Sequence, residues 1–244
     1  MQRPDTQTVF LDAGNTLISM DLAWLSALLA AHGIETTAEE LNRAEAAARP
    51  DTSAHVADST GQSGPSAFAY YLSRIVDQLP VAAGVSAECR QNCVAAVTAA
   101  VKTPGGDHKL WSIVLPGVPE ALAILKQAGL RLVVVSNSDG SVERALEGLG
   151  LAARIDLILD SQVVGFEKPD PRFFRYALER SGATAETTVH VGDMYFQDVV
   201  GARSAGIRPV LLDPYGDWVD RDCERSPDLA SFANGLAASL GDVR

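Results

Sequence analysis

The sequence predicts an α/β fold, in which a doubly wound, mostly parallel sheet is interrupted by an inserted all-helical segment. Two observations predict it. From Leu110 onward, short runs rich in Val, Leu and Ile alternate with helical segments of about ten residues. Residues 20–107, by contrast, are rich in alanine and repeat apolar residues at spacings of three and four. This segment contains no convincing strand and is therefore expected to be helical.

The first strand is expected to end at Leu11, in the run TVFL, directly before Asp12. Within the helical block, Thr37 stands three residues before Glu40, the spacing of a capping box at a helix start. Residues 49–67 (RPDTSAHVADSTGQSGPSA) are rich in Ser, Thr, Gly and Pro, and we expect them to form a long loop.

The second half of the chain alternates regularly between the two kinds of element. Helices are expected at 117–129, 141–150, 171–182 and 196–206, and strands at 130–137, 155–160, 187–193 and 208–213. Right-handed crossovers between such strands give a parallel sheet covered on both faces. The predicted domains are therefore a core of residues 1–19 and 108–244 and a helical domain of residues 20–107.

Composition excludes several kinds of partner. With 20 Lys and Arg against 31 Asp and Glu, the net charge is −11, which argues against nucleic acid or an anionic membrane. Three cysteines, Cys89, Cys93 and Cys223, make no disulfide framework and favour a reducing compartment. We see neither a signal peptide nor an apolar run of membrane-spanning length, and we expect a cytoplasmic protein. The sequence does not indicate an oligomeric state.

Polar residues follow the predicted strands where each strand ends. The first strand leads to Asp12, another to Ser136 and Asn137, and a third to Asp193. Ligands of parallel sheets bind outside the carboxyl ends of the strands, so we expect these side chains to share one site. Lys168, in a loop before a helix that Pro171 is expected to begin, adds a cation to it.

These blocks resemble, in order, the four motifs of the haloacid dehalogenase-like (HAD) hydrolases. They are Asp12-x-x-x-Thr16, Ser136 after a hydrophobic strand, Lys168-Pro169, and Gly192-Asp193-x-x-x-x-Asp198. The resemblance implies a Rossmann-like core, and the long gap between the first two motifs has room for the helical cap of one subclass. The helical block itself is similar to that cap only in its position and helicity.

The resemblance also implies roles for the matching residues. Asp12 would be the nucleophile that forms an aspartyl-phosphate, and Mg²⁺ would be held by Asp12, the main-chain carbonyl of Gly14 and Asp193. Asp198 would not bind the metal directly. It would orient either the waters on the metal or the side chain of Lys168.

Four further residues would handle the phosphoryl group or its loops. Ser136 and Lys168 would hold the transferring oxygens, and Thr16 and Asn137 would fix the phosphate-binding loops. The implied function is a magnesium-dependent phosphatase of a small phosphorylated metabolite. His190, inside a predicted strand, is expected to pack in the core rather than to act as a base.

Gly14 departs from the family pattern, which generally has a second aspartate there as acid and base. Asp21, His32 and His55 are candidates for a substitute acid. Alternatively, the leaving group needs no proton, as in an acyl phosphate or at an activated carbon centre. Dehalogenases and phosphonatases of the family also lack the second aspartate, but Lys102 is the one lysine that the helical block offers for phosphonatase chemistry. A third alternative is a protein that binds a phosphorylated ligand or partner and turns over slowly or not at all.

Overall fold

The computed structural model describes residues 6–59, 65–102 and 109–241. The chain divides into two compact units, Met1–Ile18 with Val114–Arg244, and Ser19–Ile113. We call them the sheet unit and the helical unit. The domain boundary predicted at residues 107 and 108 lies outside the described residues.

The sheet unit is built on one parallel sheet, as the sequence predicts. Within the described residues it has six strands in the order β5-β4-β1-β6-β7-β8, and each neighbouring pair is parallel. The strands are β1 (Thr8–Leu11), β4 (Arg131–Ser136), β5 (Leu157–Asp160), β6 (Thr188–Gly192), β7 (Arg208–Leu212) and β8 (Glu224–Ser226). The central strand β1 pairs in register with both β4 and β6, so that Phe10 lies between Val133 and His190.

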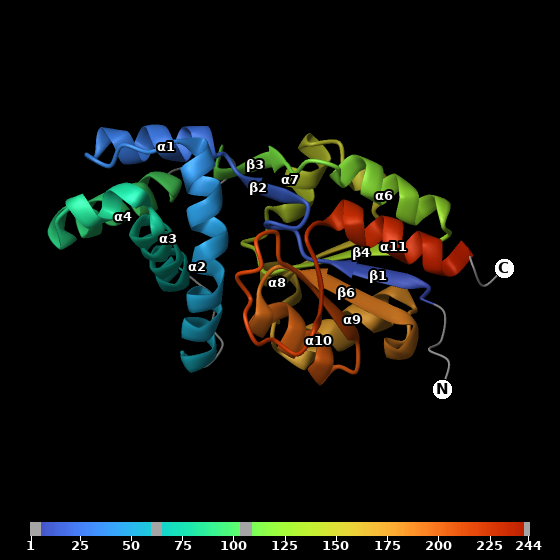
Figure 1. Cartoon of the computed structure of the whole chain (residues 1–244). Coiled ribbons are helices and arrows are strands. Elements are labelled where there is room, and N and C mark those ends of the chain that lie inside the picture. Colours follow the sequence, from blue (N-terminus) through green and yellow to red (C-terminus); the bar gives the residue numbers. More distant parts are fainter. Residues whose placement is uncertain (1–5, 60–64, 103–108, 242–244) are drawn as a thin grey trace. The chain divides into compact units, whose positions relative to one another are not determined.

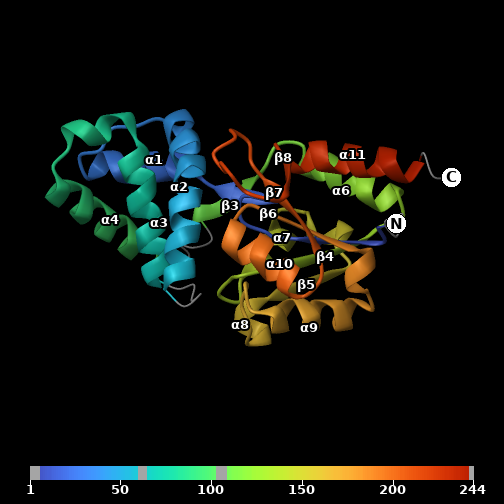
Figure 2. The same cartoon turned by 60° about the horizontal axis from the view of Figure 1, so that its bottom comes forward.

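Helices cover both faces of this sheet. In Figures 1 and 2, α6 and α11 lie on one face and α9 and α10 on the other. The helices of the unit are α6 (Val118–Gln127), α7 (Val142–Gly148), α8 (Ser161–Val164), α9 (Pro171–Ser181), α10 (Gly201–Ser204) and α11 (Leu229–Gly241). Three short 3₁₀ or π turns join them, η2 (Ala152–Arg154), η3 (Ala185–Thr187) and η4 (Tyr195–Val200). Apolar side chains of β1, β4 and α9, among them Phe10, Val133 and Phe173, form a buried core on one face.

The helical unit consists of α1 (Leu22–Ala31), α2 (Ala38–Asp58), α3 (Pro65–Gln78), the 3₁₀ turn η1 (Pro80–Gly84) and α4 (Ala87–Val101). The capping box predicted at Thr37 and Glu40 is confirmed, since each side chain accepts a main-chain N–H of the other residue. The unit has its own apolar core, to which α1, α2, α3 and α4 all contribute. Among the described helices of the chain, none is long and apolar enough to cross a membrane.

The loop predicted at residues 49–67 is wrong at both ends, since α2 runs to Asp58 and α3 begins at Pro65, and residues 60–64 lie outside the described residues. Helix α2 continues through Pro50 to Asp58, although a proline removes one main-chain hydrogen bond from the helix. Packing compensates for this loss, because Val56 is buried and the His55 ring stacks on Tyr70 of α3 with centroids 3.7 Å apart. The Thr52 hydroxyl also donates to the Ala48 carbonyl. Composition indicated a loop, but tertiary contacts keep this segment helical.

Two short strands, β2 (Ile18–Met20) and β3 (Trp111–Val114), pair where the chain passes between the two units. The Leu115 N–H donates to the Leu17 carbonyl, and the Asp21 N–H donates to the Leu110 carbonyl. The sequence analysis missed this pair and β8, because strands of three or four residues carry too little periodicity to be recognised. It also missed α11, a helix of 13 residues.

Candidate active site

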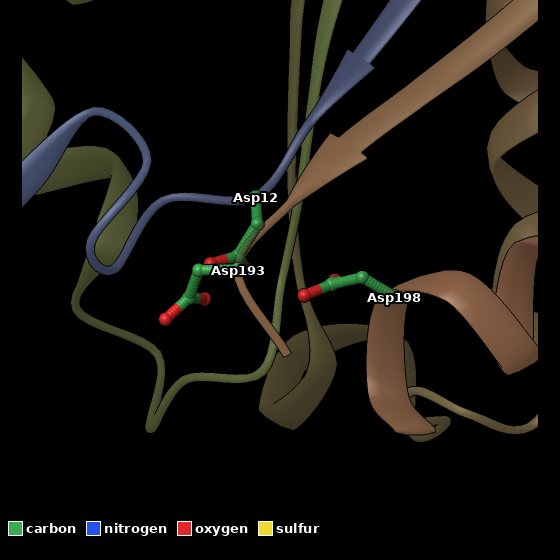
Figure 3. A group of neighbouring side chains, drawn as sticks. All are labelled: Asp12, Asp193 and Asp198. Atoms are coloured by element: carbon green, nitrogen blue, oxygen red, sulfur yellow. The ribbon is translucent and has the colours of Figure 1, made fainter. Parts of the chain in front are cut away.

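Three aspartates meet at the carboxyl edge of the parallel sheet. Asp12 follows β1, Asp193 follows β6, and Asp198 lies in the π-helical turn η4. Their carboxylate oxygens can be chosen so that all lie within 4.8 Å of one another. Figure 3 shows Asp198 reaching in from the helix toward Asp12 and Asp193. Because β1 and β6 are neighbours in the sheet, their ends deliver Asp12 and Asp193 side by side.

A glycine makes the approach of Asp198 possible. A Cβ atom on Gly192 would lie only 2.2 Å from the Asp198 carboxyl carbon, so a larger residue would displace it. The Asp198 carboxylate also accepts the Met194 N–H, at 2.9 Å, and so closes the turn after β6. Gly192 is therefore required for the backbone to pass close to Asp198.

Lys168 bridges two of the three acids. Its ammonium nitrogen lies 2.5 Å from Asp12 Oδ1 and 2.7 Å from Asp198 Oδ1, and its side chain is 2% exposed. Asn137, directly after β4, holds the lysine in place through its amide group. The main-chain N–H of Lys168 donates to Asn137 Oδ1, at 2.7 Å, and Asn137 Nδ2 donates to the main-chain carbonyl of Lys168, at 2.9 Å.

A second close approach fixes the loop that carries Lys168. A Cβ atom on Gly201 would lie 2.7 Å from the Phe174 ring and 3.0 Å from Pro169 Cα. The absence of a side chain thus lets the start of α10 pack against the Lys168–Pro169 loop, whose peptide bond is cis. The helix predicted to begin at Pro171 does so, with Asp170 as its N-cap.

Burial and charge shift the pKa values of these groups in different directions. Burial raises the pKa of the Asp12 carboxyl above its usual range, against the opposing effect of Lys168. Burial alone would lower the pKa of Lys168, but Asp12 and Asp198 outweigh it and raise that pKa. For Asp198, burial is outweighed by Lys168 and by the His190 hydrogen bond, so that its pKa is lowered and it stays an anion.

His190 is buried in the core, as predicted, but it also contacts the site. Its Nε2 lies 2.9 Å from Asp198 Oδ1, and its ring packs edge-on against Phe174. Burial lowers the pKa of the His190 imidazole, so that the ring is neutral at pH 7. The sequence offered one signal for this contact, a histidine between two valines, three residues before Asp193.

Asn15 is another site residue that the sequence analysis missed. It has a left-handed backbone, with φ of 49°, which asparagine tolerates better than most residues. Its Nδ2 donates to Asp193 Oδ2 at 3.2 Å, so the loop after β1 helps to orient the acid after β6. Preceding Asn15, Gly14 forms an isolated bridge with Ile18, and it has no side chain to supply an acid.

The two predicted hydroxyl residues are buried near the strand ends. Ser136 is the last residue of β4 and is 4% exposed, and Thr16 is 1% exposed. Within the described part of the chain, Thr16 Oγ1 has no hydrogen-bond partner. A buried hydroxyl without a partner is costly and is consistent with a group that a ligand completes.

The candidate replacements for the missing acid lie in the helical unit. Asp21 is the N-cap of α1 and accepts the Trp24 N–H, and His32 is the exposed C-cap of the same helix. His55 stacks on Tyr70. A role for any of them as an acid stays a prediction. Lys102, the lysine considered for phosphonatase chemistry, is an exposed C-cap of α4.

The donor set fits a hard divalent cation. Both Asp198 oxygens already accept hydrogen bonds, Oδ1 from Lys168 and His190 and Oδ2 from Met194. Asp12 Oδ1 accepts a hydrogen bond from the Lys168 ammonium, and no hydrogen bond to Asp12 Oδ2 is found among the described residues. A cation beside Asp12 and Asp193 would meet the oxygen ligands that Mg²⁺ and Ca²⁺ prefer. Asp198 is better suited to supporting Lys168 than to binding metal.

Comparison with known proteins identifies the family. The model of the haloacid dehalogenase-like hydrolases matches residues 6–206. The chain belongs to this family. It is 42% identical over 131 residues to haloacid dehalogenase-like hydrolase domain-containing protein 3 of Mus musculus, covering 52% of each chain. It is 45% identical over 123 residues to phosphoserine phosphatase of Thermus thermophilus, covering 47% of each chain.

The chain thus spans about half the length of the curated relatives it matches. The crystal structure of the HAD-hydrolase YfnB from Bacillus subtilis bound to magnesium has a TM-score of 0.64 to this chain at 17% identity. That match covers 96% of this chain and 99% of the other. At such low identity the likeness establishes the shared HAD fold, and it confirms the fold class expected from the four motifs.

Proposed function

We propose that this hydrolase is a magnesium-dependent phosphatase that acts on a small phosphorylated metabolite through an aspartyl-phosphate on Asp12. The observation that carries the proposal is the position of Lys168, whose ammonium bridges Asp12 and Asp198 beside the carboxylate of Asp193. A buried lysine held between a strand-end carboxylate and a supporting carboxylate suits the transfer of an anionic group.

Asp12, Asp193 and the main-chain carbonyl of Gly14 would hold Mg²⁺. When bound, the ion would neutralise charge on the phosphoryl group and keep Asp12 ionised against the effect of burial. The oxygen-rich donor set at the ends of β1 and β6 supports this assignment. Asn15 would fix the orientation of Asp193, whose Oδ2 accepts its amide hydrogen.

The chemistry of the chain's own residues follows from their contacts. Lys168 holds Oδ1 of Asp12, and the Asp12 carboxylate would attack phosphorus. The new Asp12–phosphorus bond forms as the bond to the leaving oxygen breaks, and that oxygen departs with the electron pair. Water then attacks the phosphorus, phosphate leaves, and the Asp12 carboxylate is restored. Ser136, Thr16 and Lys168 would hold the transferring oxygens.

Gly14 limits which substrates react quickly. A general acid is typically worth about 10² to 10⁴ in rate. Without it, esters whose leaving group is already a stable anion should react best, unless Asp21, His32 or His55 supplies the proton. We further propose that the helical unit is a cap that excludes water and selects the substrate.

The named relatives support phosphatase chemistry. One relative is named phosphoserine phosphatase, and the Bacillus subtilis structure was determined with magnesium. Gly14 also fits a second candidate, a phospho-ligand-binding protein with slow or no turnover. A dehalogenase-like or phosphonatase-like hydrolase of carbon–heteroatom bonds is less well supported, since the carboxylate cluster suits a metal and Lys102 is exposed.

Hydrolysis of p-nitrophenyl phosphate and of acetyl phosphate, each with and without Mg²⁺, tests the proposal. Both leaving groups are good enough to depart without an acid, so we expect turnover that requires Mg²⁺. The Asp12→Asn variant should lose it, because an amide is no nucleophile here. Turnover in folded Asp12→Asn would contradict the proposal. No turnover of either substrate by the wild type would favour the binding candidate.

A further inference from the structure

We propose that His190 is a positioning residue, which locks the Asp198 carboxylate and thereby keeps Lys168 against Asp12. The inference rests on the proposed function for its kinetic consequence, but the structural part stands independently. It starts from a histidine in the middle of β6, a strand whose side chains are all buried.

Packing alone does not account for a histidine at this position. His190 is completely buried, its ring packs edge-on against Phe174 with centroids 5.0 Å apart, and its strand partner on β1 is Phe10. Its Nδ1 has no hydrogen-bond partner within the described residues. Burying that nitrogen unpaired costs free energy that an apolar side chain of similar size would avoid. The compensating feature is the contact of Nε2 with Asp198 Oδ1 at 2.9 Å.

The partner of Nε2 determines where the ring proton lies. Asp198 Oδ1 also accepts the Lys168 ammonium at 2.7 Å, so this oxygen belongs to a carboxylate and can only accept. The proton must therefore be on Nε2. A second proton on Nδ1 would be a buried donor without an acceptor among the described groups. The geometry thus defines a neutral ring with its hydrogen on Nε2.

The consequence for the site runs through Asp198. Three donors fix this carboxylate: Lys168 and His190 on Oδ1, and the Met194 N–H on Oδ2. Without the His190 N–H, one lone pair of Oδ1 would be unpaired, and the carboxylate could turn and draw Lys168 toward itself. Because the same ammonium holds Asp12 Oδ1 at 2.5 Å, a shift of Lys168 would misplace the proposed nucleophile.

The first test reads the tautomer directly in the metal-free, full-length protein. Long-range ¹H–¹⁵N correlation at pH 7 resolves the ring nitrogens of the four histidines, and the His190→Gln variant assigns the signal. We expect a single neutral ring protonated at Nε2. A ring protonated at Nδ1, or a cationic ring, would overturn the proposal whatever the activity of the protein.

The second test separates positioning from packing. In His190→Phe the ring remains but the donor is lost, whereas Gln at this position can again donate to Asp198. We expect His190→Phe to lower kcat for p-nitrophenyl phosphate by about 10- to 100-fold with little change in KM, the range seen when partners of site residues are removed. His190→Gln should restore most of that kcat.

Val133→Ala provides the matched control, because Val133 is a buried residue of the same core and lies opposite Phe10 on β4. It should lower the melting temperature while leaving kcat unchanged. Wild-type kcat in folded His190→Phe, or equal losses in the Phe and Gln variants, would refute positioning even if the phosphatase activity stands. If the wild type itself proves inactive, the proposed function fails, and the tautomer measurement still decides the role of His190.

Discussion

Each unit of this protein buries an ion pair, and the two pairs are built in different ways. In the helical unit, Arg49 donates two hydrogen bonds, at 2.6 and 2.7 Å, to Glu45, four residues earlier on α2. The Tyr71 hydroxyl, from α3, donates to the same carboxylate. In the sheet unit, Lys168 contacts Asp12, which is 156 residues away in the sequence, and shares its ammonium with Asp198.

The difference teaches how far each pair depends on the whole fold. The spacing between Glu45 and Arg49 places both on one helix face, so the contact between these two side chains lies within α2, and the Tyr71 hydroxyl of α3 adds to it. The Lys168 contacts require β1, the loop before α9 and the turn after β6 to be assembled together. The Glu45–Arg49 pair joins residues of one helix and ties α2 to α3 through Tyr71. One ammonium held between carboxylates from distant segments is instead the arrangement expected of a reaction centre.

Removing the site cation should produce the largest effect. In Lys168→Met, two buried carboxylates lose the ammonium that they share, and the transferring oxygens lose a donor. We expect kcat for p-nitrophenyl phosphate to fall by about 10² to 10³. Lys126→Met is the control, because this half-exposed lysine pairs with Asp156 and should leave kcat unchanged. Activity in Lys168→Met close to that of the wild type would remove the distinction between the two pairs.

Breaking the other pair should affect stability. Glu45→Gln removes the buried carboxylate that accepts the two Arg49 hydrogen bonds, and we expect the free energy of unfolding to fall by about 3 kcal/mol. Urea unfolding followed by circular dichroism measures it. Replacing both residues, with Glu45→Leu and Arg49→Met, should recover most of the loss, since well-packed apolar groups can substitute for a buried pair. A double variant as unstable as the single one would mean that this pair is more than a packing device.

Introducing an acid at position 14 tests whether proton transfer limits the proposed reaction at the site. If proton transfer limits the reaction of alkyl phosphates, Gly14→Asp should accelerate their hydrolysis, by up to about 10². It should have less effect on p-nitrophenyl phosphate, and Gly14→Asn, a variant of the same shape without the acid, should show no acceleration. Equal rates in wild type and folded Gly14→Asp would place the acid elsewhere, with Asp21, His32 and His55 as candidates.

Removing the exposed ion pair of Lys126 and Asp156 should have the smallest effect on stability. The Lys126 ammonium and the main-chain N–H of Leu132 both donate to the Asp156 carboxylate. Partial burial would raise the pKa of Asp156, but these hydrogen bonds outweigh it and lower that pKa. A lowered carboxyl pKa stabilises the fold above the pKa of the unfolded chain, and this stabilisation is lost as the pH falls through the folded value. Asp156→Asn should therefore cost less than about 1 kcal/mol at pH 7 and nothing at the lowest pH. Urea titrations across this range measure the cost, and a pH-independent difference would contradict the assignment.

The sequence predicted well what depends on local patterns. The capping box at Thr37, the helix start at Pro171 and the strands that lead to Asp12 and Asp193 are all in the structure. Since ligand-binding residues of a parallel sheet gather at the strand ends, the predicted strand ends were enough to indicate that those acids share one site.

What the sequence did not predict depends on contacts between distant segments. Pro50 signalled a loop, but the packing of α2 on α3 keeps the helix intact. A helix was expected at residues 196–206, but its first part is the π-helical turn η4, which the apolar pattern does not distinguish from an α-helix. His190 was expected to pack in the core, and its bond to Asp198 follows only when β6 and that turn are placed together.

The most direct test of the central claim is to trap an adduct on Asp12. In the presence of Mg²⁺ and beryllofluoride, the ¹⁹F NMR spectrum of the wild type should contain resonances of a bound adduct. Asp12→Asn should lack them. Asp213→Asn should keep them, because Asp213 also follows a parallel strand but binds Arg225 and the Asp217 N–H instead. An adduct that persists in folded Asp12→Asn would contradict the account.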